Sequence, residues 1–434
     1  MDKIICSLEE WDSVINYYRP NGSSKTWYLK ELKKLSRPLM WGDWNIYSED
    51  GDLFPETMFH SIVTPVFSKV MEYVPMDKIG DSKHVYIINV YTSHFFVDNL
   101  EIGFSCVSPK YLEDVRNGNS KILMFFIYEG YSGADGNFDL EIIEKWRRDA
   151  NLPEDSIYYV CGNFLIQDLI KHKGLKFQGR GIHFFEPWNK YKSDEVVDFI
   201  PKDDKYLFLS YNRQPRHHRI QLMLDLLKRD MFRMGVISLY QFEHDIPDGA
   251  NEEHYEYLYK NAPFIIDPKY DLHYNLAVNI TKEDYERTFI SLVTETLVDS
   301  GTLFFSEKVW KPIMVGHPFL LYGNKHSLKF LKELGYQTFD KWIDESYDNE
   351  PDRNKRCEMV VEQLNKFKDM SIEELTNIRN EMKSVCEFNQ LKFKELYFEK
   401  YGNDDMNIDI KNIMVEVWED INKEKNLPLK EKLI

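Results

Sequence analysis

Apolar residues in the first half of the chain fall into short continuous runs separated by helix-like stretches. The runs at residues 84–90, 121–128 and 156–160 are apolar almost throughout. Between the second and the third run, residues 138–150 repeat apolar positions with helical spacing. Strands that are buried on both faces and alternate with helices indicate a parallel sheet covered by helices.

A second series of the same kind begins after about residue 200. It predicts a helix at residues 216–229 and strands at residues 206–209, 235–240, 289–294, 302–305 and 318–322. Between the first of these strands and the helix, residues 210–215 are expected to form a turn. Two successive series of this kind predict an α/β protein with two Rossmann-like domains that face each other across a cleft.

Beyond residue 350 the pattern is helical. Ser371 and Glu374 have the spacing of a capping box, which predicts a helix from there to about residue 401. A last helix is expected at about residues 410–423. The predicted division of the chain is an N-terminal α/β domain at 1–200, a second Rossmann-like domain at 201–350, and a C-terminal helical segment at 351–434 that packs on the domains.

The charge balance restricts the possible ligands. The chain has 434 residues, with 55 Lys and Arg against 72 Asp and Glu, and a net charge of −17. Nucleic-acid-binding proteins usually carry a basic face, so this balance argues against broad nucleic-acid binding. A phosphate ligand would need a local cluster of Lys and Arg that acts against the overall negative charge.

Cysteine usage and hydropathy restrict the protein class further. The five cysteines are widely spaced and form no C-x-x-C pair, which predicts neither a zinc site nor a disulfide framework. The N-terminus lacks the apolar run of a signal peptide, and no stretch reaches the roughly 18 apolar residues of a membrane span. We therefore predict a cytoplasmic protein, in the host cytoplasm if it is viral, with no transmembrane segment and no metal site.

Basic residues follow the predicted strand at residues 206–209. Residues 210–219 read Ser-Tyr-Asn-Arg-Gln-Pro-Arg-His-His-Arg, which places Arg213, Arg216 and Arg219 close to the start of a helix. Backbone N–H groups and the helix dipole favour an anion there, and Arg binds phosphate through paired hydrogen bonds. The turn is a candidate phosphate site, although a solvated basic turn has the same composition.

A second cluster follows the predicted strand at residues 302–305. Ser306 is a candidate N-cap, and Glu307 and Lys308 fall in the first helical turn. Lys308 could bind a diphosphate, and Glu307 could accept hydrogen bonds from ribose or sugar hydroxyls. Glu295, at the end of an apolar strand, could orient sugar hydroxyls or pair with the nearby arginines. A capped helix with ordinary first-turn charges is the alternative.

These features occur along the chain in a fixed order. The order is S-x-N at 210–212 with an arginine at 219, V-T-E-T at 293–296, F-S-E-K at 305–308 and P-F-L-L-Y-G at 318–323. It resembles the nucleotide-sugar-binding domain of fucosyltransferase-like glycosyltransferases, particularly bacterial and viral ones, over about residues 205–345. At residues 296–306 the chain departs from the tyrosine-containing stretch that the family usually carries, so the nucleotide base and the sugar stay open.

The resemblance implies the two-domain GT-B architecture and an inverting, metal-independent transfer of a sugar. The donor would be a GDP- or UDP-linked sugar with no further cofactor, and the acceptor a hydroxyl of a glycan or another molecule on the side of the N-terminal domain. By position, Arg219 resembles the family arginine at the donor diphosphate, and Lys308 the lysine that offsets phosphate charge. Glu307 resembles the glutamate near the donor ribose or sugar, and Glu295 the acidic residue upstream. The predicted donor site is completed by Asn212, Arg213, Arg216 and Ser306.

An inverting transfer needs a base that takes the proton of the acceptor hydroxyl. Glu129 is the candidate, because it ends the most apolar predicted strand of the N-terminal domain and precedes a glycine. A carboxylate that only closes a turn explains the same pattern, and Asp135 and His94 are weaker candidates. Residues 50–52, Asp-Gly-Asp, would suit a metal-dependent transferase, but they follow no buried strand and are typical of an acidic turn.

Two other functions stay open. Phage-type enzymes that glycosylate modified DNA bases share the reaction type, and Lys171, Lys173, Lys176 and Arg180 form a basic stretch that could contact a nucleic-acid backbone. A non-catalytic sugar-binding or scaffold protein could keep the fold without the activity. The aromatic-rich N-terminal region could stack on sugar rings, although such side chains more often belong to a core.

Overall fold

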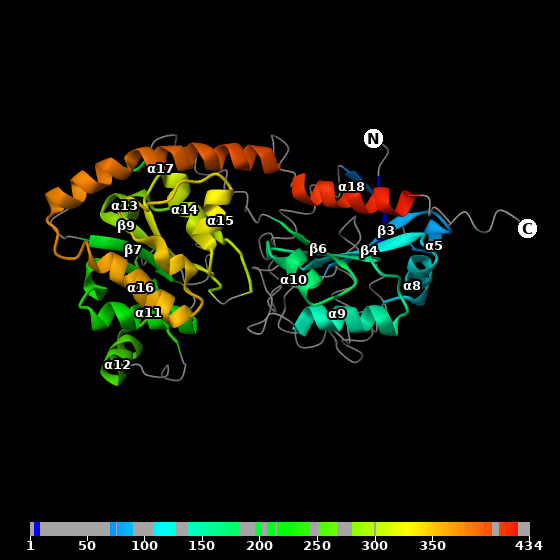
Figure 1. Ribbon diagram of the computed structural model, residues 1–434, viewed down its shortest axis with the longest axis horizontal. Coiled ribbons are helices and arrows are strands. Elements are labelled where there is room, and N and C mark those ends of the chain that lie inside the picture. Colours follow the sequence, from blue (N-terminus) through cyan, green and yellow to red (C-terminus); the bar gives the residue numbers. More distant parts are fainter. Residues whose placement is uncertain are drawn as a thin grey trace, which may run out of the picture. The chain divides into compact units, whose positions relative to one another are not determined.

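The chain folds into two compact units, which a computed structural model describes (Figure 1). One unit comprises Met1–His183 together with Lys400–Ile434, and the other comprises Phe184–Glu399. The C-terminal part of the chain is thus shared between the units, whereas the sequence-based division has its boundaries at residues 200 and 350. The structure describes residues 4–8, 70–74, 76–89, 107–126, 138–182, 196–201, 206–212, 215–242, 251–266, 280–298, 301–401 and 408–423.

The first unit is built on a parallel sheet of six strands in the order β2-β1-β3-β4-β5-β6. Its strands are β1 (Ile4–Leu8), β2 (Met71–Tyr73), β3 (His84–Asn89), β4 (Ser120–Phe126), β5 (Ile157–Cys161) and β6 (Gln178–Gly181). Its helices are α5 (Met76–Ile79), α8 (Pro109–Arg116), α9 (Phe138–Asp149), α10 (Ile166–His172) and α18 (Ile408–Asn422). The three predicted strands of this half are observed as β3, β4 and β5, and the predicted helix at 138–150 is observed as α9. Their apolar residues are mostly buried, as the sequence pattern indicates.

Helices cover both faces of this sheet. Tyr86 of β3 and Ile122 of β4 belong to the core that α8, α9 and α10 form on one face. Side chains of alternate residues point to opposite faces, so Val85 and Leu123 point to the other face. There α18 packs against β1, β3 and β4, on the side of the sheet opposite to α9 (Figure 1).

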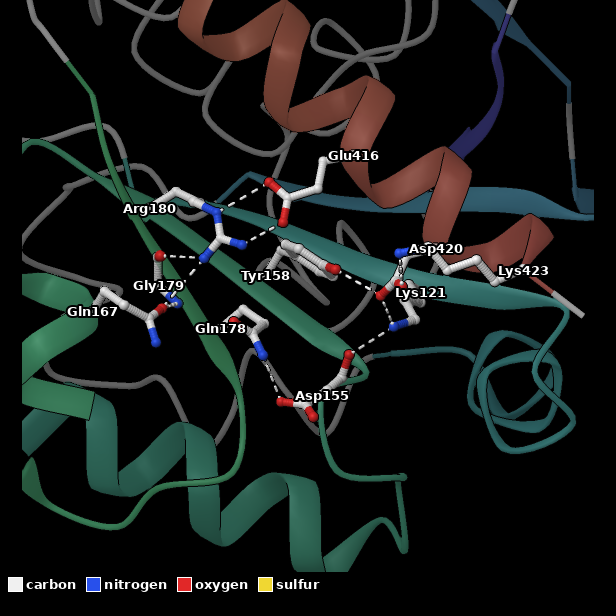
Figure 2. A network of polar contacts seen from close by, with 10 residues as sticks. All are labelled: Lys121, Asp155, Tyr158, Gln167, Gln178, Gly179, Arg180, Glu416, Asp420 and Lys423. Atoms are coloured by element: carbon white, nitrogen blue, oxygen red, sulfur yellow. Dashed lines mark hydrogen bonds and ion pairs between the residues drawn. The ribbon is translucent and has the colours of Figure 1, made fainter. Parts of the chain in front are cut away.

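Charged groups fix α18 to the sheet in addition to its apolar face (Figure 2). The Asp420 carboxylate accepts a hydrogen bond from Tyr158 Oη of β5 at 2.7 Å and pairs with Lys121 of β4. Arg180 of β6 donates from Nε to Glu416 at 3.1 Å. Burial alone would raise the pKa of Asp420, but the hydrogen bonds from Lys121 and Tyr158 outweigh it and lower that pKa to about 2.

The second unit contains a parallel sheet of four strands in the order β10-β9-β7-β8. Its strands are β7 (Tyr206–Asn212), β8 (Gly235–Leu239), β9 (Thr288–Thr294) and β10 (Phe319–Tyr322). Its helices are α11 (His217–Lys228), η2 (Phe232–Met234), α12 (Glu252–Asn261), α13 (Lys282–Glu286), α14 (Glu307–Val315), α15 (Ser327–Glu333), η4 (Glu345–Asn349), α16 (Arg353–Asn365) and α17 (Ile372–Tyr401). Together the two parallel sheets and the C-terminal helices confirm the predicted α/β class.

One predicted strand of this unit is wrong. Residues 302–305 form no strand, although Leu303, Phe304 and Phe305 are all buried. Their apolar run reflects burial in the core rather than pairing with a neighbouring strand. The next backbone N–H, that of Ser306, bonds a side-chain carboxylate instead of a strand.

The predicted C-terminal helices are present. Ser371 and Glu374 form the expected capping box, with Ser371 N–H donating to Glu374 Oε2 at 2.7 Å and Glu374 N–H donating to Ser371 Oγ at 3.2 Å. Helix α17 then packs on the second unit, where its buried Gln390 donates to Met314 O at 2.7 Å. Within the ranges that the structure describes, no helix combines the length and the apolar content needed to cross a membrane.

The α18 contacts predict an acid-sensitive stabilisation of the first unit. The pKa of Asp420 is lowered from 3.8 to about 2, so its contribution to stability is present above about pH 4 and is lost as the pH falls towards 2. Asp420→Asn should therefore lower the free energy of unfolding at pH 7 by on the order of 2 kcal/mol, with a smaller difference from the wild type at pH 3. Urea unfolding at both pH values measures this, and hydrogen exchange of residues 408–422 identifies the element that is released.

Asp149→Asn is the matched control for this change. It breaks an exposed pair between Asp149 and Lys145, whose side chains are 64% and 58% exposed. Pairs of this kind contribute little to stability, so both unfolding and exchange should stay close to the wild type. An equal effect of Asp420→Asn at pH 7 and pH 3 would contradict the assignment.

Candidate functional site

The candidate site lies at the carboxyl edge of the four-stranded sheet, between β7 and β9. From β7 the chain passes through α11 to β8 on one side, whereas from β9 it passes through α14 to β10 on the other side. In open α/β sheets, ligands bind outside the carboxyl ends of the strands at such a switch point. Helices α11 and α14 lie on opposite sides of β7 and β9 in Figure 1. Hydrogen bonds from Arg216 and Ser306 to residues 295 and 296 place both helix starts beside the end of β9.

Three side chains from the N-cap and the first turn of α11 reach the end of β9. Arg216 Nη1 donates to Thr296 O at 3.1 Å, and Arg219 Nη2 donates to Glu295 O at 3.5 Å. His218 Nε2 lies 3.1 Å from the same Glu295 oxygen, and because a carbonyl only accepts, Nε2 carries the hydrogen. Burial, together with the charge of Arg219, lowers the pKa of His218 well below its ordinary value, which keeps this ring neutral.

Asn212 differs from its predicted place in a turn. It is the last residue of β7, because the pairing of β7 with β8 continues to Asn212 and Leu239. The side chain is buried and donates from Nδ2 to Ser210 Oγ at 2.8 Å, so its amide nitrogen bonds within the strand. Arg213, which the sequence also assigns to this site, lies outside the described residues.

The start of α14 brings the second predicted cluster to the same place. Ser306 is the N-cap, as predicted, and its Oγ accepts from Lys308 N–H at 3.3 Å. The Lys308 ammonium lies 2.6 Å from Glu307 Oε1 and donates to Thr296 Oγ1 at 3.2 Å. Lys308 therefore occupies a position between the helix that carries it and the segment that follows β9.

Glu295 organises the segment between β9 and α14. Its side chain is fully buried, and its Oε2 accepts from Thr296 N–H at 3.3 Å, from Ser306 N–H at 3.0 Å and from the Ser306 hydroxyl at 2.5 Å. Its Oε1 has no hydrogen-bond partner among the described residues. Burial raises the pKa of Glu295, and the charge of Lys308 and the Ser306 hydrogen bond oppose that rise.

Glu307 is held in its ionised form. Burial alone would raise the pKa of this carboxyl group, but the charges of Lys308 and Lys311 and the hydrogen bond from Lys308 outweigh it and lower the pKa to about 2. The side chains of Glu307 and Lys308 are 21% and 14% exposed, so the pair is mostly buried but not closed off from solvent at the first turn of α14. A ligand that drew Lys308 away would leave a carboxylate able to accept hydrogen bonds.

Two side chains at this edge were not among the predicted site residues. Thr296 supplies a carbonyl to Arg216 and a hydroxyl to Lys308, and only its place within the V-T-E-T motif indicates such a role. Lys311 is buried on α14, with its Nζ 5.5 Å from the centroid of the Tyr211 ring at the end of β7. Its spacing of three residues from Lys308 on a helix is the signal that could have identified it.

Several predicted residues are not among those that the structure describes. The candidate base Glu129, its weaker alternatives Asp135 and His94, and the acidic residues 50–52 lie outside the described residues. In the part of the chain that the structure describes, no group of three or more His, Cys, Asp or Glu side chains could hold a metal ion.

The basic stretch considered for nucleic-acid contacts is largely paired with carboxylates. Lys173 lies 2.9 Å from Glu141, and Lys176 lies 3.8 Å from Glu154. Arg180 pairs with Glu416 of α18. These cations are therefore partly neutralised within the first unit, which weakens the argument that this stretch contacts a phosphate backbone.

Comparison with known proteins finds a distant likeness among solved structures. No family model matches the chain, and no curated protein matches it. Among solved structures, the crystal structure of the GtfA/B complex is similar, with 10% sequence identity and a TM-score of 0.34. The similarity covers 78% of this chain and 58% of that chain, so it spans less than two thirds of the latter.

The electrostatics of the site predict how Glu307 titrates. Lys308→Met should raise the pKa of Glu307 from about 2 towards or above its ordinary value of 4.5, because burial continues to act when the ammonium is removed. A carbon-13 NMR titration of the glutamate carboxyl groups measures the change. Lys355→Met, which removes the 2.7 Å partner of Glu350 in the same unit, should leave the Glu307 titration unchanged. An unaltered midpoint in Lys308→Met would contradict the assigned cause.

Proposed function

We propose that the second unit binds the diphosphate of a nucleotide sugar between β7 and β9, and that the protein is a glycosyltransferase. The observation that carries this proposal is the convergence of Arg216, Arg219 and Lys308 on the Glu295–Thr296 segment. These cations come from the first turns of two helices, whose N-termini also favour an anion. In a protein with a net charge of −17, such a local concentration of cations supports a specific anionic ligand.

The proposed reaction is a single displacement at the anomeric carbon of the sugar. The acceptor hydroxyl oxygen bonds to that carbon while the bond from the carbon to the diphosphate oxygen breaks. The diphosphate leaves with the electron pair of the broken bond, and the acceptor proton passes to a base. Attack opposite the leaving group inverts the configuration of the carbon, in agreement with the resemblance to inverting fucosyltransferase-like enzymes.

Positive charge at the leaving group is the main catalytic contribution that we assign to the second unit. Negative charge grows on the diphosphate as the bond breaks, and fixed cations in a partly buried site stabilise it. Arg219 is 2% exposed, and Lys308 is held by Thr296 and Glu307. Neither side chain therefore has to be ordered from a solvated, mobile state when the ligand binds. We propose that these side chains, with Arg216, supply the charge that a metal ion supplies in metal-dependent transferases.

Thermal unfolding in the presence of EDTA tests the donor site. UDP, GDP, CMP and their sugar conjugates are compared, and one nucleoside diphosphate should raise the Tm, since a ligand at about 100 times its Kd adds roughly 2.7 kcal/mol to stability. Lys308→Met and Arg216→Gln should weaken binding by about 10- to 100-fold, as expected for a lost charge-assisted hydrogen bond. The control is Lys260→Met, which removes an exposed lysine of α12 that pairs with Glu256 at 2.6 Å. This variant should bind the nucleotide like the wild type.

Each outcome of this experiment decides between functions. A shift with one diphosphate names the nucleotide base and decides between a GDP-linked and a UDP-linked donor. Binding that disappears with EDTA and returns with Mg²⁺ would overturn the metal-independent mechanism. The absence of a shift with any nucleotide would overturn the donor site and favour a scaffold role for the fold.

The acceptor base remains a prediction from the sequence and needs a separate experiment. Glu129→Gln should lower kcat by about 10²- to 10⁴-fold with little change in donor Kd, as expected for loss of general-base catalysis. His94→Gln is the informative comparison. The switch point of the six-stranded sheet lies between β1 and β3, where ligands bind in open α/β sheets. His94 follows β3 along the chain, whereas Glu129 follows β4. Full turnover in Glu129→Gln together with its loss in His94→Gln would transfer the role to His94.

A further inference from the structure

The hydroxyl group of Ser306 bonds in two directions at the start of α14. A serine hydroxyl has one hydrogen to donate and two lone pairs that accept. The Ser306 hydroxyl donates its hydrogen bond to the Glu295 carboxylate at 2.5 Å. The lone pairs are then left for Lys308, whose backbone N–H lies at 3.3 Å and whose ammonium lies at 3.4 Å.

The same carboxylate oxygen also fixes the second group that bonds the lysine. Glu295 Oε2 accepts from the backbone N–H of Thr296 at 3.3 Å and from that of Ser306 at 3.0 Å. Thr296 Oγ1 in turn accepts from the Lys308 ammonium at 3.2 Å. One buried oxygen atom therefore holds both residues whose hydroxyl oxygens lie next to the lysine.

We propose that Glu295 is a positioning residue, which acts through Ser306 and Thr296 to direct the Lys308 ammonium at the diphosphate of the donor. The inference rests on the proposed donor site. It differs from both roles that the sequence suggests for Glu295, which were to orient sugar hydroxyls or to pair with the nearby arginines; the printed bonds of Arg216 and Arg219 go to backbone oxygens. With its side chain fully buried and one oxygen taken up by three protein donors, Glu295 is placed to order the site rather than to touch the ligand.

Charge repulsion by Glu295 and positioning of Lys308 by Glu295 predict opposite effects on diphosphate affinity when Glu295 is removed. A carboxylate beside a phosphate site repels the ligand, so charge alone would make Glu295→Ala bind the diphosphate more tightly. If Glu295 positions Lys308, the same change weakens binding, because the hydroxyls beside the lysine lose their fixed orientation. Glu295→Gln separates the two further, since its amide oxygen can still accept from the same three donors while the negative charge is gone.

The test measures the Kd of the nucleoside diphosphate that stabilises the wild type, using titration calorimetry on full-length protein with EDTA present. Glu295→Ala should weaken binding by about tenfold, and Glu295→Gln should stay within about threefold of the wild type. In a Lys308→Met background, Glu295→Ala should cause no further loss beyond about twofold, because its effect acts through the lysine. Circular dichroism verifies that each variant is folded.

Ser291→Ala is the matched control, because it removes a different buried serine hydroxyl, which lies in β9 at 2.9 Å from His317 Nδ1. It should lower the Tm and leave the Kd unchanged, which separates loss of stability from loss of positioning. Should Glu295→Ala fail to fold, Ser306→Ala carries the same test, with about tenfold weaker binding that vanishes in the Lys308→Met background.

Three results would overturn the inference in different ways. Unchanged or tighter binding of the diphosphate by Glu295→Ala would mean that the carboxylate affects the ligand through its charge and does not position Lys308. An equal loss of affinity with and without Lys308 would make Glu295 a general structural residue. If the wild type binds none of the nucleoside diphosphates, the proposed donor site itself fails, and the inference fails with it.

Discussion

Parallel pairing of β7 with β9 is the constraint on which the candidate site depends. The two strands are neighbours in the sheet, yet their connections leave on opposite sides, so that α11 and α14 begin at the same strand ends. Parallel strands require such long crossovers, and their carboxyl ends necessarily meet at one edge. Residues that are far apart in the sequence, at positions 216–219, 295–296 and 306–308, thereby come within hydrogen-bond distance.

The strands that were predicted have an apolar run that is visible in the sequence, whereas β1 (Ile4–Leu8) and β2 (Met71–Tyr73) were not predicted. The edge strand β6 (Gln178–Gly181) has no apolar side chain and was missed; it forms because it pairs with the edge of β5. Its glycines permit a close approach, since a Cβ atom on Gly181 would lie 2.8 Å from Asn163 O. Residues 302–305 show the converse error: their apolar side chains are buried, but burial does not imply pairing with a strand.

The candidate site was predictable where local sequence determines it. Basic residues and an N-cap directly after apolar strands indicated both helix starts, and Ser306 and Lys308 occupy the positions expected of them. The role of Glu295 could not be predicted, because it depends on a segment of ten residues returning to place Ser306 beside the end of β9. Lys311 was missed for a related reason, since its proximity to Tyr211 joins residues that are 100 positions apart in the sequence.

If the proposed donor site binds a diphosphate, this acidic protein must keep several cations together before the ligand arrives. Here protein acceptors bond them in the meantime: Thr296 and Glu295 present carbonyl oxygens to the arginines, and Glu307 with two hydroxyls bonds Lys308. Such bonds cost ligand affinity, because a diphosphate must compete with Glu307 for the lysine. They also spare the ligand the entropy of ordering long side chains, which for Lys and Arg is about 2 kcal/mol each. The carboxylates of this site are therefore compatible with the proposed anion binding, in which Glu307 exchanges its partner and the proposed role of Glu295 keeps the lysine in place.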